Sequence, residues 1–72
     1  MTRRYLVVIE KADGNYSAYS PDIPGCVAVG DTLEEVSLRM REAIEFHLHG
    51  LIEDKLPIPE PNTKAEYLAV EA

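Results

Sequence analysis

Glu45, His47 and His49 are the side chains of this sequence whose types best suit a transition metal. Residues two apart on a helix point about 200° apart, so the two histidines cannot bind one ion from one helix. Glu45 and His49 are four residues apart and could share an ion, but two protein ligands without a third are insufficient. We therefore predict no metal or other cofactor, a partly buried His47 and a solvated His49.

Cys26 is the one thiol and the candidate nucleophile. A nucleophilic cysteine needs a base and a lowered pKa, and the neighbouring residues indicate neither. Cys26 follows Pro24 and Gly25, which is typical of a small residue packed where a loop meets a strand. A single cysteine also excludes an internal disulfide and a four-thiolate zinc site. The sequence therefore predicts a structural Cys26.

Asp13, Asp22 and Asp31 could in principle bind the metal ions of a metal-dependent nuclease. Each aspartate also has an ordinary explanation, as a turn residue, a loop residue and a helix-entry residue. Gly25 and Gly30 do not match a phosphate-binding glycine pattern. The chemistry of these residues therefore favours a protein that is not an enzyme, with a residual nuclease as an alternative.

Short strands and tight turns make up the first part of the sequence. Residues 5–10 carry apolar side chains on both alternating faces, which is typical of a strand in the middle of a sheet. Turn residues at 12–15 and a second run at 16–20 predict a hairpin. Two prolines make 21–26 a rigid loop, and 27–29, ended by glycine, predicts a third strand.

A helix and a final strand are predicted in the second part. Thr32 and Glu35 form a capping box, and apolar residues recur at steps of three and four from Leu33 to about Leu51. Three prolines between 57 and 61 predict an extended connector, and 67–70 predicts a fourth strand. The sequence thus predicts an α+β fold of order β-β-β-α-β, a small, mostly antiparallel sheet with one helix on one face.

One helix covers only one face of a sheet, yet the first strand is apolar on both. The second face must therefore meet something other than water, which predicts a homo-oligomer, a dimer or tetramer, or a partner protein.

Size and charge limit the remaining possibilities. The 72 residues allow one small domain, spanning residues 1–72. The 7 basic and 13 acidic residues give a net charge of −6, which disfavours nucleic acid and anionic membranes as partners and suits a basic protein. No apolar run is long enough for an export signal or a spanning helix, so we expect a cytoplasmic protein.

Several segments together resemble one known family. The most specific is the Pro-rich loop followed at a fixed distance by the helix start, and the full set comprises Tyr5–Lys11, Asp13-Gly14, Tyr16, Ser20-Pro21-Asp22-Ile23-Pro24-Gly25-Cys26, Gly30-Asp31-Thr32-Leu33-Glu34-Glu35 and Pro57-Ile58-Pro59. With these residues the sequence resembles the HicB-like antitoxins of toxin–antitoxin systems over nearly its whole length. Val36 stands where alanine is more usual in that family, a change that leaves the helix intact.

The resemblance implies a pared-down ribonuclease-H-like fold and a protein-binding role. Its partner would be a small, basic, RNA-cleaving HicA-type toxin, which the antitoxin neutralises by covering the active site. Many family members carry a C-terminal DNA-binding segment; this sequence resembles a short form without it, so we expect no direct contact with nucleic acid. A stand-alone homo-oligomer that has lost its toxin is the other alternative.

The residues that carry the resemblance have two possible roles. They either contact the partner or serve as a rigid structural motif, and both roles stay open for Asp22, Ile23, Pro24, Gly25, Cys26, Gly30 and Asp31. Thr32 and Glu35 are assigned to the helix cap.

Overall fold

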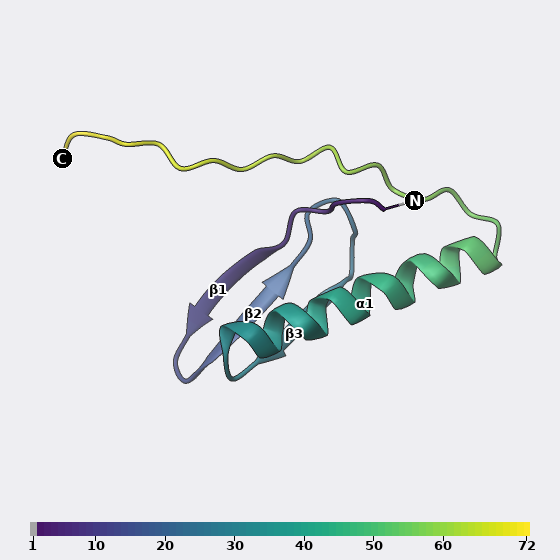
Figure 1. Cartoon of the computed structure of the whole chain (residues 1–72), viewed down its shortest axis with the longest axis horizontal. Helices are drawn as coiled ribbons and strands as arrows, with labels where there is room; N and C mark the ends of the chain where they lie inside the picture. Colours follow the sequence, from purple (N-terminus) through teal and green to yellow (C-terminus); the bar gives the residue numbers. More distant parts are fainter. Residues whose placement is uncertain (1) are drawn as a thin grey trace.

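The computed structural model describes residues 2–72, and three strands precede one helix. The elements are β1 (Val8–Ala12), β2 (Asn15–Tyr19), β3 (Val27–Gly30) and α1 (Leu33–Glu53). Both strand pairs are antiparallel, and the sheet has the order β1-β2-β3. Figure 1 shows α1 crossing β2 and β3, which confirms the predicted α+β fold with one helix against the sheet.

The predicted hairpin is present between β1 and β2. Ala12 pairs with Asn15, so only Asp13 and Gly14 form the turn. Gly14 has a φ of 78°, in the left-handed region that glycine enters without the steric cost of a Cβ atom. This register places Ile9 opposite Ala18 on the face that meets α1.

The core is small and draws on the sheet, the loop before β3 and the helix. Among residues 2–72, five apolar side chains are buried: Ala18, Ile23, Cys26, Val36 and Met40. Val36 and Met40 are one helical turn apart and therefore lie on the same side of α1. Ser20 is the buried polar residue, and its hydroxyl donates to the Leu6 carbonyl at 2.8 Å, so the hydroxyl is not left unsatisfied.

The helix extends two residues beyond the predicted end at Leu51. Gly50 lies inside α1 and does not end it. The chain leaves the helix through Asp54, whose amide donates to the Gly50 carbonyl at 3.1 Å, and Lys55, which has a φ of 57°. This left-handed residue turns the chain away from the helix axis.

The predicted fourth strand at 67–70 is wrong for this chain. Residues 56–72 contain neither helix nor strand, and Figure 1 shows them as an extended segment on the β1 side, with the C-terminus away from the sheet. A strand needs a neighbouring backbone to bond, and a cleft of about 420 Å³ separates residues 65–67 from residues 6–9. Apolar residues at 67–70 therefore lack the pairing that would make them a strand.

The first strand also differs from the prediction. It begins at Val8 instead of Tyr5, and it lies at an edge of the sheet instead of in the middle. Both differences follow from its neighbours, because β2 ends at Tyr19 and no fourth strand within the described residues 2–72 pairs on the other side. Within residues 2–72, no helix is long and apolar enough to cross a membrane.

Candidate partner-binding surface

The loop between β2 and β3 is a rigid plug of the core. The Ile23 amide donates to the Ser20 carbonyl at 3.2 Å, and the Cys26 amide donates to the Ile23 carbonyl at 3.3 Å, so two turns follow each other. Ile23 is fully buried, and Gly25 has a φ of 81° that an L side chain would strain. The loop therefore holds the sheet and the helix together through Ile23.

Asp22 in the same loop holds the chain after the connector. Its Oδ1 accepts from the Thr63 hydroxyl at 2.7 Å, and its Oδ2 accepts from the Thr63 amide at 3.0 Å. These bonds favour the charged carboxylate, so the Thr63 hydroxyl first and the Thr63 amide second lower the pKa of Asp22 below its ordinary value. The Tyr5 hydroxyl donates to the Pro59 carbonyl at 2.7 Å and fixes a second point.

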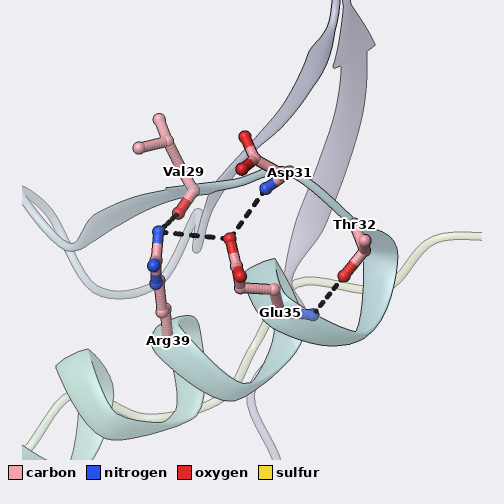
Figure 2. A network of polar contacts seen from close by, with 5 residues as sticks. All are labelled: Val29, Asp31, Thr32, Glu35 and Arg39. Carbon is pink, nitrogen blue, oxygen red and sulfur yellow. Dashed lines mark hydrogen bonds and ion pairs between the residues drawn. The ribbon is translucent and has the colours of Figure 1, made fainter.

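The start of α1 is held by a network of polar contacts, shown in Figure 2. The Glu35 amide donates to the Thr32 hydroxyl at 3.0 Å, as the capping box predicts. The Glu35 carboxylate accepts from the Asp31 amide at 2.8 Å, one residue before the amide that a capping box uses. Arg39 Nη1 lies 3.4 Å from that carboxylate and donates to the Val29 carbonyl of β3 at 2.9 Å.

Arg39 links α1 to β3 in a way that the sequence did not predict. Its spacing of four residues from Glu35 is a recognisable signal for an ion pair on one helix face. Its bond to the Val29 carbonyl has no such signal, because it depends on how α1 packs against β3. Through this bond a charged side chain occupies a backbone acceptor of β3.

The motif residues divide into buried and accessible ones. Ile23, Cys26 and Gly30 are buried, and a Cβ built on Gly30 would stand 2.7 Å from the Val36 amide nitrogen. Pro24, Gly25 and Asp31 are exposed, and Asp22 is partly exposed. The buried residues fix the fold, and the exposed ones remain available for contact with a partner.

The groups considered for catalysis do not come together. Burial raises the pKa of the Cys26 thiol, which is the opposite of what a nucleophile requires. Asp13 and Asp31 lie at one end of the sheet, whereas Asp22 follows β2 at the other end. Among residues 2–72, no three His, Cys, Asp or Glu side chains are grouped closely enough to hold a metal ion. His47 is half-buried and His49 is exposed, as predicted.

The sheet face opposite α1 is not covered by the helix, and it carries apolar side chains beside Glu10 and Ser17. Side chains of successive strand residues point to opposite faces of the sheet. Ile9, Ala18 and Ala28 pack on the helix side, so their neighbours in the strands point to the other face. Tyr19, Val27 and Val29 are 42%, 68% and 56% exposed. We call this surface, made of Val8, Tyr19, Val27 and Val29, the open face.

The solvent side of α1 combines apolar and charged residues. Leu33 and Leu38 border a shallow groove of about 410 Å³ that also includes Glu34 and Arg41. Phe46 is 84% exposed, the most of any apolar side chain on the helix. An exposed aromatic side chain beside carboxylates is a typical anchor for a protein partner, especially a basic one.

Comparison with known proteins identifies the family. A family model described as a HicB-like antitoxin of a bacterial toxin–antitoxin system matches residues 5–72. A protein described as an uncharacterised 14.9 kDa protein of Haemophilus phage HP1 is 42% identical over 64 residues, which cover 89% of this chain and 48% of the relative. Antitoxin HicB 2 of Photorhabdus laumondii is 35% identical over 63 residues, which cover 88% of this chain and 45% of that protein.

A solved structure agrees with these relatives. A chain of a HicA3 and HicB3 toxin–antitoxin complex superposes with a TM-score of 0.69 at 32% identity, over 83% of this chain and 70% of that chain. This chain spans about half the length of the phage and Photorhabdus relatives. The family match over residues 5–72 nevertheless includes every element of the fold. The chain therefore belongs to the HicB-like antitoxin family of bacterial toxin–antitoxin systems.

Proposed function

We propose that this chain is a cytoplasmic antitoxin that binds a small, basic, RNA-cleaving toxin of the HicA type and has no catalytic activity of its own. The observation that carries the proposal is the similarity, at a TM-score of 0.69, to a chain of a HicA3 and HicB3 complex. Family membership and the scattered positions of Asp13, Asp22 and Asp31 support a binding role instead of a nuclease role.

Charge supports the choice of partner. The net charge of −6 attracts a basic protein, raises the rate of encounter and disfavours direct binding to nucleic acid. Since exposed charges are screened over roughly 8–10 Å at physiological salt, the association rate constant should fall as salt rises, while dissociation changes little. Stopped-flow association at several salt concentrations measures this dependence, and a salt-independent rate would contradict electrostatic steering.

The solvent side of α1 is the surface that we assign to the toxin. Phe46 is the anchor, because an aromatic side chain that is 84% exposed contributes little to the fold and much to an interface. The Phe46→Ala variant should fold normally and bind the toxin at least about tenfold more weakly. Val27→Ala on the open face is a matched control, since Val27 is 68% exposed on the opposite side of the sheet and should leave toxin affinity unchanged.

The test of the function begins with the neighbouring genes, where we expect a small basic protein to be encoded. Co-expression should relieve the growth arrest caused by that protein, and the two proteins should co-purify. Failure of both would overturn the proposal. The mechanism has its own readout: a purified complex should not cleave RNA, and a complex that still cleaves RNA would show that the antitoxin binds without covering the active site.

A further inference from the structure

The C-terminal segment has the features of a strand without a partner. We call residues 63–72 the tail; it is extended, and Figure 1 shows it leaving the body of the molecule. Tyr67 is fully exposed, and Leu68 and Val70 are 74% and 79% exposed. Neighbouring residues in an extended chain point to opposite sides, so the tail presents apolar side chains on both sides together with unpaired backbone groups.

The base of the tail is fixed, so its direction is set by the fold. Asp22 holds Thr63 by two hydrogen bonds, and Tyr5 holds the Pro59 carbonyl. From this anchor the tail passes β1 across the cleft of about 420 Å³ between residues 6–9 and 65–67. The tail therefore runs beside its own β1 without bonding to it.

The two edges of the sheet differ in accessibility. On β3, Arg39 of α1 donates to the Val29 carbonyl, and Glu35 accepts from the amide of Asp31 just beyond the strand. β1 pairs with β2 on one side, and the cleft adjoins its first residues on the other. A strand edge of this kind readily accepts an added strand. β1 is therefore the edge on which another strand fits.

We propose that the tail of one copy adds as a strand to the β1 edge of a second copy, and reciprocally, in a symmetric dimer. One chain holds both the unpaired strand and the unpaired edge, so a two-fold pair satisfies both at once. Ten extended residues span about 33 Å, enough to cross to a neighbouring molecule. Residues 65–70 carry a single charge, on Glu66, so like-charge repulsion does not oppose pairing.

The second copy also explains the open face. Val8 belongs to both β1 and the open face, so apolar side chains of the added tail that point to this side lie beside Val8 and continue the open face. Pairing and apolar burial then act together, as a stable interface requires. This dimer does not depend on the toxin, so its failure would leave the proposed antitoxin function intact.

The experiment compares proline variants of the full chain by sedimentation or light scattering. The unmodified chain should have twice the monomer mass of 8.0 kDa. Backbone amides of successive strand residues alternate in direction, so at least one of Leu68→Pro and Ala69→Pro should remove a ladder bond and weaken the dimer by at least about tenfold. Glu60→Pro, in the proline-rich connector, is the control and should leave the dimer unchanged.

Three results would overturn the proposal. The first is a monomer at all micromolar concentrations, and the second is a dimer that neither tail variant weakens. The third concerns a tail that pairs within its own chain: the amides of Tyr67–Val70 would be protected from hydrogen exchange in a monomer. The proposal predicts nuclear Overhauser effects from the tail of an isotope-labelled copy to β1 of an unlabelled copy.

Circular dichroism should show that both tail variants keep the fold, because the tail is exposed throughout.

Discussion

Replacing Gly30 by alanine should destabilise the protein through a single backbone contact. A Cβ at this position would stand 2.7 Å from the Val36 nitrogen, 3.0 Å from the Val36 Cα and 3.2 Å from the Glu35 carbonyl carbon. All three are backbone atoms of α1, so the start of the helix must move. Over-packing of this kind costs about 1–3 kcal/mol, and loss of the Thr32 cap would add about 1 kcal/mol.

Gly50→Ala is the matched control with the opposite sign. Gly50 lies in α1, is exposed, and has no atom within 4 Å of a built Cβ. Alanine there should stabilise the helix by about 0.5–1 kcal/mol. For a domain of this size, about 1 kcal/mol changes Tm by about 4–8 °C, so the two variants should differ clearly.

Urea unfolding followed by circular dichroism measures the free energy of unfolding of each variant. All samples are compared at one protein concentration, because oligomerisation makes stability depend on concentration. Gly30→Ala should unfold at lower urea than the unmodified chain, and Gly50→Ala at higher urea. A neutral Gly30→Ala variant would refute the argument from close approach. Equal effects of the two substitutions would show that backbone entropy alone controls both sites.

Three further predictions concern the loop before β3. Ile23→Ala should cost about 2–5 kcal/mol in the same urea assay, because the side chain is fully buried; a cost below 1 kcal/mol would contradict its role as a plug. Cys26 should react with a thiol reagent much more slowly in the folded chain than in urea, since burial raises the pKa of the thiol; equal rates would be inconsistent with this burial. The Thr63 hydroxyl first and the Thr63 amide second lower the pKa of Asp22 below its ordinary value, so the bonds to Thr63 should be lost only as the pH falls through that lowered pKa. The chemical shift of the Thr63 amide in NMR reports this step, and a midpoint above the pKa of an ordinary aspartate would contradict the prediction.

Local chemistry made the helix and the hairpin predictable. Thr32 and Glu35 mark the helix start through contacts within four residues, and Gly14 permits the turn by its own backbone freedom. The uncovered sheet face was also predictable, because strand alternation and a single helix determine it together. Each of these features depends on residues that are close in sequence or on a simple period.

Non-local pairing defeated the prediction of the fourth strand. The apolar side chains at 67–70 favour a buried strand in the sequence. A strand also needs a neighbouring backbone to bond, and the sequence does not show which segment supplies it. The bond between Asp22 and Thr63 spans 41 residues, and the bond between Arg39 and Val29 depends on helix packing. The position of β1 at the sheet edge follows from the same missing pair.

The most specific sequence motif, the loop at 20–26 with the helix start at 30–35, therefore indicates the fold more than the partner. Ile23 and Cys26 are in the core, Gly30 contacts the helix backbone, and Asp22 anchors the tail. A substitution at any of these residues would therefore change the stability of the folded chain, whether or not that residue contacts a partner. Under the proposed function, specificity for one toxin would then come from exposed residues, of which Phe46, outside the motif, is the clearest. If the proposed function holds, two chains with the same loop and helix start would share this fold and could still bind different toxins.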